Sequence, residues 1–337
     1  MMIQRAGRAT WLFQQQPSVI GYASVVGKKE TEGPLGEGFD RVIPDSYNGC
    51  DTYEEAEARM QRSALRLAAA KCNLEAKDID CVFAGDLLNQ CIGSSFGLKN
   101  LGIPYLGQYA ACATMAQSLM TAAMMVESGA VKTAACVTSS HFCAAERQYR
   151  FPLEYGSVRT PTAQWTVTGA GGCVLQRASE PLRIAAATVG KITDLEMTDP
   201  NNMGAAMAPA AAETILRFFS DTGTAPDEYD RVFTGDLGQV GSDLLHRLLL
   251  REGCDLRSRH SDCGLMIFDR TGQDVHAGGS GCGCCASVLC SEIFNSLRAG
   301  KFRNILFVAT GALLSITSAQ QSKTIPAIAH LVNFRAE

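Results

Sequence analysis

One six-residue string appears twice in the chain with a single change. It reads Val-Phe-Ala-Gly-Asp-Leu at residues 82–87 and Val-Phe-Thr-Gly-Asp-Leu at residues 232–237. Each copy follows a helix-like segment and an acidic approach, at residues 78–80 and 227–230. In each copy a short apolar run stops at Gly-Asp, as a buried strand does when it delivers a carboxylate to its carboxyl end. The repeat predicts two similar α/β halves, with Asp86 and Asp236 at equivalent strand ends.

The segments around each copy alternate between helix and strand patterns. Thr52 and Glu55 have the spacing of a capping box, and an apolar face then recurs from Tyr53 to Cys72, which predicts a helix. The other elements predicted in the first half are strands at 81–84, 105–108 and 134–138 and helices at 94–100 and 112–128. In the second half we predict helices at 206–220, 243–252 and 281–299, strands at 231–234 and 304–309, and a hairpin around Gly272 that joins residues 265–268 to 274–276.

Composition excludes several classes of partner and location. The net charge is −4 and no Lys/Arg cluster resembles a nucleic-acid footprint, so no nucleic-acid partner is expected. Residues 101–126 carry no charge, but polar and helix-breaking residues such as Pro104 and Gln117 argue against a membrane span. The first residues lack the apolar core of a signal peptide. We expect a soluble or peripherally associated protein with no transmembrane segment.

The cysteines predict packing and not metal binding. A chain of this length with fourteen cysteines and no secretory signal keeps them reduced, as small buried residues. Cys282, Cys284 and Cys285, with Cys290 further on, have no recognised zinc spacing and lie where a helix starts. Alternating Gly, Cys and Ala provide the small side chains needed where two central helices approach. No metal site is predicted.

Residues 109–115, Tyr-Ala-Ala-Cys-Ala-Thr-Met, resemble the nucleophile turn of thiolases and β-ketoacyl synthases. In those enzymes the cysteine sits where a strand turns into the central helix, so the helix N-terminus favours a thiolate. The resemblance implies a thiolase-like α/β fold, in which two βαβαβ-type halves form an α-β-α-β-α sandwich with buried central helices. We expect these halves at residues 1–180 and 181–337, in one integrated unit, with Cys112 in the pocket.

A closer resemblance rests on Asp40 and on residues 83–90, 144–148, 154–156, 207–212, 262–267 and 309–315. In these residues much of the chain resembles one thiolase-like family of spore-forming bacteria, the stage V sporulation protein AD family. The resemblance implies binding of dipicolinic acid, pyridine-2,6-dicarboxylate, and a part in its uptake into the developing spore. It further implies a homodimer at the forespore or spore inner membrane, with other membrane-bound stage V sporulation proteins as partners. No cofactor is expected, and the sequence leaves open whether calcium accompanies the ligand as the dipicolinate chelate.

The second half speaks against condensing chemistry. A condensing enzyme needs histidine, and often asparagine, to stabilise the thioester oxyanion and to move protons. In similar β-ketoacyl synthases a histidine follows the first strand of the second half, where this chain has Gly235 and Asp236. An anionic aspartate opposes an oxyanion. The expected asparagine turn is replaced by Gly-Gly-Ser-Gly at residues 278–281. The alternative, an active acyltransferase, would use Cys112 as nucleophile and His276 as base, although His276 also reads as a solvated loop residue.

A small set of residues is predicted to bind the dicarboxylate. Asp86 and Asp236 end equivalent strands and read equally well as ligand contacts or as caps. Asn89 and Gln90 offer amide groups, although loop solvation explains them nearly as well. The polar segment 141–150 offers a histidine and two guanidinium forks, which match carboxylates, and aromatic rings to stack on pyridine; a surface loop at a subunit interface explains it equally well. The ligand-binding set is Cys112, Asp86, Asn89, His141, Arg147 and Asp236, with Arg150, Tyr149, Phe151 and Tyr155 as further candidates.

Overall fold

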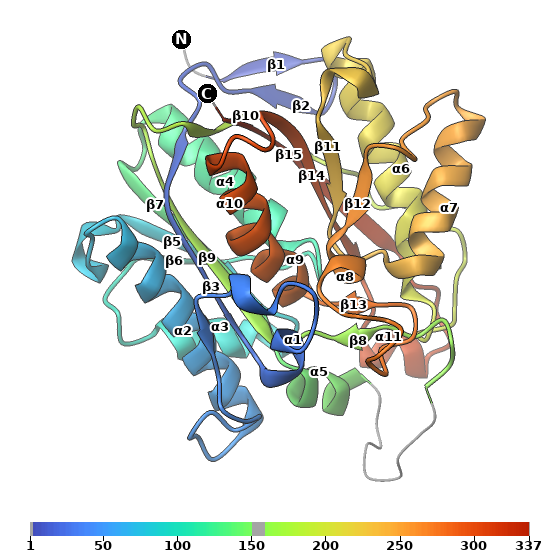
Figure 1. Ribbon diagram of the computed structural model, residues 1–337, viewed down its shortest axis with the longest axis horizontal. Helices are drawn as coiled ribbons and strands as arrows, with labels where there is room; N and C mark the ends of the chain where they lie inside the picture. Colours follow the sequence, from blue (N-terminus) through green and yellow to red (C-terminus); the bar gives the residue numbers. More distant parts are fainter. Residues whose placement is uncertain (1–2, 150–158, 337) are drawn as a thin grey trace.

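The computed structural model describes residues 3–149 and 159–336, and ten of the strands in this part of the chain form two sets of five with the same order (Figure 1). In each set the first three strands run parallel and the last two are antiparallel to their neighbours. The α/β fold with a duplicated core is therefore confirmed. The first set is β6 (Tyr105–Gly107), β5 (Cys81–Gly85), β7 (Thr133–Ser140), β9 (Gly169–Gln176) and β3 (Ser18–Val26), and the second is β12 (His260–Asp262), β11 (Arg231–Thr234), β14 (Asn304–Ala312), β15 (Ala327–Ala336) and β10 (Leu182–Thr188).

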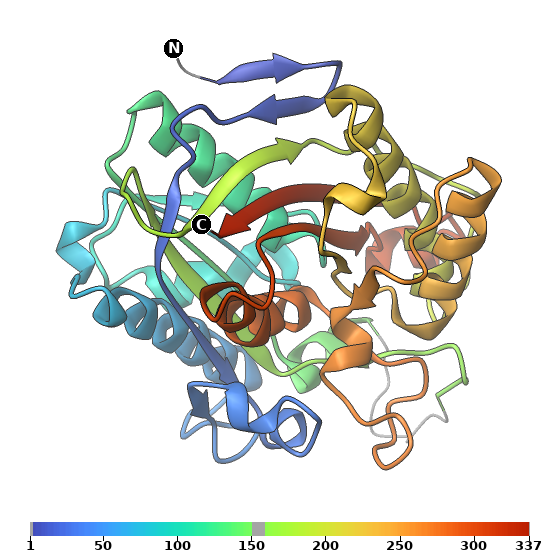
Figure 2. The ribbon, with the colours of Figure 1, turned by 45° about the horizontal axis from the view of Figure 1, so that its top comes forward.

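Helices fill three layers around these two sets (Figures 1 and 2). One pair packs on the outer face of the first set, and an equivalent pair flanks the second set. Between the sets lie the three central helices, and a π-helical turn at Leu289–Ile293 joins the last two of them. This is the predicted layered sandwich. The outer helices are α2 (Tyr53–Lys71), α3 (Ile92–Leu98), α6 (Met203–Thr222) and α7 (Gly238–Arg251), and the central ones are α4 (Thr114–Ser128), α9 (Cys282–Val288) and α10 (Phe294–Arg298).

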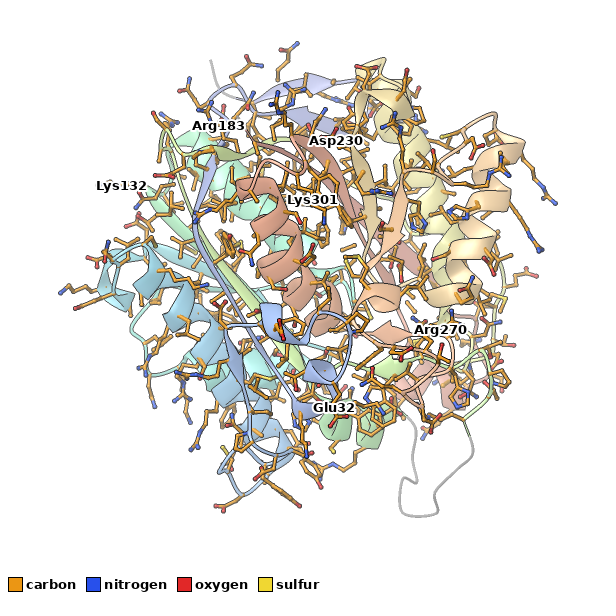
Figure 3. All side chains as sticks on the ribbon, viewed as in Figure 1. Glu32, Lys132, Arg183, Asp230, Arg270 and Lys301 are labelled. Atoms are coloured by element: carbon orange, nitrogen blue, oxygen red, sulfur yellow. The ribbon has the colours of Figure 1, made fainter. Side chains whose placement is uncertain are left out.

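The acidic approaches to the repeated string make the same contacts in both halves. Asp80 accepts hydrogen bonds from the backbone N–H groups of Lys132 and Thr133, each at 2.8 Å, which ties the start of β5 to the start of β7. Asp230 accepts from the N–H groups of Arg303 and Asn304 at 2.6 and 2.9 Å, which ties β11 to β14 in the same way. Figure 3 labels Lys132 and Asp230 at these two corners. The flanks of the repeat are thus structural equivalents.

Small residues bring the layers into contact. A Cβ atom on Gly171 of β9 would lie 2.1 Å from the carbonyl oxygen of Ala286 in α9, and one on Gly311 of β14 would lie 2.2 Å from that of Ala110. Larger side chains at these positions would push the central helices off the strands. The cysteines serve the same packing, since Cys282, Cys284 and Cys285 are fully buried.

Several elements have no counterpart among the predictions. Strands β3, β9, β10 and β15 were not expected, and the two sets join where Arg183 of β10 pairs with Ser18 of β3. The boundary predicted at residue 180 stays a prediction; it falls between β9 and β10. The short elements are β1 (Gln4–Ala6), β2 (Thr10–Leu12), α1 (Lys28–Thr31), β4 (Arg41–Val42), α5 (Phe142–Tyr149), β8 (Trp165–Thr166), α8 (Cys263–Met266), β13 (Gly279–Ser280) and α11 (Ile316–Gln320).

The hairpin predicted around Gly272 is wrong. The Asp262 side chain accepts a hydrogen bond from the backbone N–H of Leu265 at 3.2 Å and so caps a helical turn, α8, where the first hairpin strand was expected. Residues 274–276 contain no strand, and the chain instead pairs β13 with β8. The helix predicted to begin at residue 243 begins earlier, at Gly238, whose φ of +61° suits glycine.

Candidate functional site

Cys112 lies at the turn before the central helix α4, as predicted. Ala111, directly before it, has a left-handed φ of +49°, and the Cys112 side chain is buried at the start of the helix. Its Sγ lies 3.9 Å from the hydroxyl oxygen of Ser280. Together they line a narrow cavity of about 40 Å³, whose other walls include Leu87, Tyr109, Ala145, Glu146, Tyr149, Thr166, Met203, Ala312 and Leu314. We call this space the inner cavity.

Asp236 stands behind the inner cavity and is fully buried. Its carboxylate accepts hydrogen bonds from the hydroxyl of Ser280 at 2.9 Å, the N–H of Gly281 at 2.8 Å and the hydroxyl of Thr310 at 2.8 Å. Burial, and then the negative charge of Asp236, raise the pKa of the Cys112 thiol well above its ordinary value. Cys112 is therefore held as a thiol, the opposite of what a nucleophilic cysteine needs.

His276 lies away from this cavity. Its Nε2 is 3.1 Å from a carboxylate oxygen of Asp274, and its carbonyl accepts a hydrogen bond from Arg270 at 2.9 Å. Figure 3 labels Arg270 on the loop that follows α8. None of the described residues that line the inner cavity is a histidine. This arrangement leaves Cys112 without a neighbouring imidazole base.

Asp86, at the equivalent strand end of the first half, bonds to its own loop. It accepts from the N–H of Leu88 at 2.9 Å and from the N–H and hydroxyl of Ser94 at 2.7 and 2.6 Å. The Ser94 hydroxyl accepts from Gln61 of α2 at 2.9 Å. Asp86 is fully buried and lines neither cavity that surrounds α5. Its present partners are those of a cap on helix α3.

Asn89 and Arg147 meet in a second, wider cavity of about 590 Å³, which we call the outer cavity. Arg147 forms an ion pair with Glu54 of α2. The amide of Gln148 donates to Asn89 Oδ1 at 3.2 Å and accepts from the Asn89 N–H at 3.2 Å. The outer cavity has the size of an ordinary small-molecule site. Its walls also include Thr52, Glu55, Leu88, Gln90, Ile92, Phe96 and Ala144.

Helix α5 separates the two cavities. Residues 144, 147 and 148 face the outer cavity, and residues 145, 146 and 149 face the inner one, in keeping with helical periodicity. Tyr149 lines the inner cavity and donates its hydroxyl to the Leu87 carbonyl at 2.6 Å. Arg150, Phe151 and Tyr155 lie outside the described residues.

His141 is held by contacts with other residues of the protein. Its Nε2 lies 2.9 Å from the carbonyl oxygen of Ser46, and its ring stacks 5.7 Å from that of Tyr53. Burial lowers the pKa of His141 to about 4, so the ring is neutral at physiological pH. His141 lines neither of the two cavities.

Sequence reasoning missed Ser280 and Thr310, the two hydroxyl donors to Asp236. Ser280 stands in the stretch 278–281 that was taken only as a replacement for an asparagine turn. Within residues 3–149 and 159–336, no group of three or more His, Cys, Asp or Glu side chains is arranged to hold a metal ion. The same part of the chain has no helix with the length and apolar character to cross a membrane.

Two solved structures illustrate the similarity of this architecture to known folds. The 3-oxoacyl-[acyl-carrier-protein] synthase III of Aquifex aeolicus is 14% identical with a TM-score of 0.56, over 95% of this chain and 99% of its own. An OleA variant of Xanthomonas campestris is 15% identical with a TM-score of 0.61, over 96% of this chain and 99% of its own. At such identities the likeness shows the fold alone. The fold is thiolase-like.

Sequence comparison then gives the family. The family model "Stage V sporulation protein AD (SpoVAD)" matches residues 7–335. Stage V sporulation protein AD of Bacillus subtilis is 44% identical over 328 residues, which is 97% of each chain. The chain belongs to the stage V sporulation protein AD family, and the resemblance noted in the sequence is confirmed.

Proposed function

We propose that this chain binds dipicolinic acid and takes part in its uptake into the developing spore, without catalysing acyl transfer. The observation that carries the non-catalytic part is the buried Asp236 carboxylate beside Cys112. A condensing enzyme must stabilise a thiolate and then an oxyanion at this place, and Asp236 disfavours both. The choice of dipicolinic acid as the ligand rests on the family resemblance.

We place the ligand in the inner cavity. Cys112 and Ser280, which line this cavity, lie two residues before central helices α4 and α9, and helix N-termini favour anions such as carboxylates. The rings of Tyr109 and Tyr149 and the side chains of Leu87 and Met203 offer apolar walls to a pyridine ring. A water molecule takes about 30 Å³ in the liquid, so a cavity of about 40 Å³ must widen for dipicolinate. Displacement of α5 would provide the room.

The outer cavity is the competing position. It has room and brings Arg147 and Asn89 together, but Glu54 neutralises Arg147 and Glu55 adds a further negative charge. Acidic side chains oppose a free dianion at both positions, because Glu146 lines the inner cavity and Asp236 stands behind it. The two positions differ in Arg147, which lines the outer cavity and not the inner one.

Calorimetric titration with dipicolinate, with and without calcium, tests the proposal. We expect saturable binding by the wild type, a loss of at least tenfold in affinity in Cys112→Tyr, which fills the inner cavity, and wild-type affinity in the control Cys254→Ala, which changes a buried cysteine elsewhere. Arg147→Gln should leave binding unchanged. Absence of binding at millimolar ligand would refute the function. Binding that Arg147→Gln abolishes would instead move the ligand to the outer cavity.

Acyl transfer makes a different prediction. An active enzyme would become acylated on Cys112 when it is incubated with acyl-coenzyme A, and Cys112→Ala would lose the adduct. We expect intact-mass spectrometry to find no adduct on the wild type. A stable adduct on Cys112 would establish the acyltransferase alternative.

We further propose that the chain is a homodimer that docks peripherally on membrane-bound stage V sporulation proteins. Strand β6 ends the first set of strands, and its residues Tyr105 and Leu106 are 36% and 47% exposed. An apolar edge strand of this kind is usually covered by another chain. We expect light scattering to give a dimer for the wild type and a monomer for Leu106→Lys. A monomeric wild type would exclude the homodimer.

A further inference from the structure

A third cavity shares no lining residue with the two cavities beside α5. It opens between the β1–β2 hairpin, the segment that follows β10 and the outer helix α6, which pack together at the end of the molecule where the hairpin lies (Figures 1 and 2). Its volume is about 540 Å³, within the range of small-molecule sites. Nothing in the proposed function uses it.

Cations converge on this cavity from three separate elements. Arg8 comes from the turn between β1 and β2, Lys191 from the segment after β10 and Arg217 from α6. The cavity wall holds one carboxylate, Glu213, which lies 3.2 Å from the Lys191 ammonium and 3.6 Å from the Arg217 guanidinium. The wall thus carries an excess of positive charge, although the chain as a whole has a net charge of −4. Like charges held together in a concavity favour an anionic ligand.

The nearby carboxylate of Asp221 is engaged by the backbone. It accepts hydrogen bonds from the N–H groups of Arg8 and Ala9 at 3.1 and 2.9 Å and from the Thr10 hydroxyl at 3.0 Å. These contacts fix the β1–β2 turn against α6. Among the described residues, none forms an ion pair with the Arg8 guanidinium, which leaves this planar fork available to a ligand.

The remaining walls are apolar. Trp11 and Val189 line the cavity beside the cations. A ring system that lies against Trp11 can therefore present a carboxylate to Arg8 and Arg217. A compact anion such as phosphate would use the charges and leave the apolar wall unused.

We propose that this cavity binds a small aromatic carboxylate, with its carboxylate between Arg8 and Arg217 and its ring against Trp11. The site is independent of the inner cavity and of the proposed function. The chain has two tryptophans, Trp11 and Trp165, so Trp165→Phe leaves Trp11 as a fluorescent reporter inside the cavity. Benzoate and inorganic phosphate serve as probes.

We expect benzoate to change Trp11 fluorescence saturably in Trp165→Phe at low millimolar concentration or below. Adding Arg217→Gln should weaken binding by roughly tenfold, the loss of about one charge-assisted hydrogen bond. The matched control Arg251→Gln, at the exposed end of α7, should leave it unchanged. A linear response to benzoate, or equal affinities of the two arginine variants, would overturn the site. Phosphate binding as tight as that of benzoate would overturn the aromatic specificity.

If Trp165→Phe does not fold, the intact chain allows the same test by NMR. The indole N–H signal that disappears in Trp11→Phe identifies Trp11, and it should shift with benzoate in the wild type and in Arg251→Gln. Cys112→Tyr, which closes the inner cavity, should leave this shift unchanged. A shift that Cys112→Tyr abolishes would mean that the response comes from the inner cavity, and the proposed site would fall.

Discussion

The two copies of the repeated string begin alike and end differently. At the start, Asp80 and Asp230 make the same pair of backbone hydrogen bonds in their two halves. At the end, Asp86 bonds to Leu88 and Ser94 within its own loop. Asp236 instead reaches residues far along the chain, and its charge opposes ionisation of Cys112. A repeated sequence therefore fixes where the backbone goes and leaves open what the last side chain does.

The segments after each copy explain this difference. In the first half a loop and helix α3 follow Asp86, and their N–H groups use its carboxylate. In the second half α7 begins at Gly238, directly after the string, and Asp262 accepts from the N–H groups of Leu237 and Gly238 at 2.8 and 3.0 Å. Because the Asp262 carboxylate caps the N-terminus of α7, the Asp236 carboxylate is free to turn towards the inner cavity.

The largest expected effect is on stability, and here the two aspartates should behave alike. Asp86→Ala and Asp236→Ala each leave three buried donors without an acceptor, so each should lower the free energy of unfolding by roughly 3 kcal/mol. Urea denaturation measures this, with Asp243→Ala on the exposed face of α7 as control, expected within about 0.5 kcal/mol of wild type. A loss below about 1 kcal/mol for either variant would mean that its hydrogen bonds matter little.

The next effect should separate the two aspartates. Asp236→Asn removes the negative charge beside Cys112, so the pKa of the thiol should fall and its reaction with methyl methanethiosulfonate at pH 8 should become about tenfold faster. Asp86→Asn should leave that rate at the wild-type value. Peptide mass spectrometry resolves Cys112 from the other cysteines. Equal rates in both variants would show that burial alone suppresses the thiolate.

Each strand-end aspartate also has a buried carboxylic neighbour, which gives a pH-dependent test. Burial and then Asp86 raise the pKa of Glu57 well above its ordinary value, whereas burial raises that of Asp262 to about 7. Glu57 accepts one hydrogen bond, from Ser139 at 2.9 Å, and its other oxygen has no partner among the described residues. A raised pKa stabilises the fold below about pH 4.5, and this contribution is lost as the pH rises through the raised value.

Glu57→Gln should therefore gain stability relative to wild type as the pH rises from 5 to 8, by about 1 to 2 kcal/mol. Thermal unfolding across this range measures the difference. Asp262→Asn should gain in the same direction up to about pH 7 but from a lower starting stability, because its carboxylate accepts hydrogen bonds from Thr234, Leu237 and Gly238 that an amide satisfies poorly. A pH-independent difference between wild type and Glu57→Gln would show that Glu57 ionises normally.

The smallest effect concerns the outer cavity. The ion pair between Arg147 and Glu54 is half exposed, so Arg147→Gln should cost less than about 1 kcal/mol of stability. Chemical denaturation at low and high salt would measure it, and the difference from wild type should shrink as salt rises. A larger, salt-independent loss would indicate that Arg147 supports α5 through packing.

The sequence predicted the parts of the fold that carry a periodic or repeated pattern. Helix α2 and strands β5 and β11 lie where the capping residues and the repeated string placed them. Strands β9 and β10 were not predicted, because they are rich in glycine and alanine and so differ in composition from ordinary strands. Close contacts with neighbouring elements require these small residues, as at Gly171. The short helix after Asp262 was not predicted, because it depends on one capping hydrogen bond from a single side chain and has no periodic pattern.

For the candidate site, the residue types predicted Cys112 and Asp236 as site residues. They did not predict that the Asp236 carboxylate lies beside the Cys112 thiol. The sequence placed both at ends of elements, and it could not say that Asp236 turns towards Ser280 and Thr310 while Asp86 turns to Ser94. Those partners lie up to 74 positions apart in the chain. Such pairings depend on how the two halves meet, which no local pattern records.

The pairing of strand β2 with strand β10 bears on how the chain is made. Leu12 lies opposite Ala186 in this pairing, so β2 leaves the ribosome long before its partner exists. Until then β2 can pair with β1, but its edge towards β10 must remain unpaired, because closing so long a loop costs entropy that only the finished contact offsets. The cavity beside Trp11 therefore cannot assemble until β10 and α6 have been translated, and a ribosome stalled before residue 182 would carry a nascent chain without it.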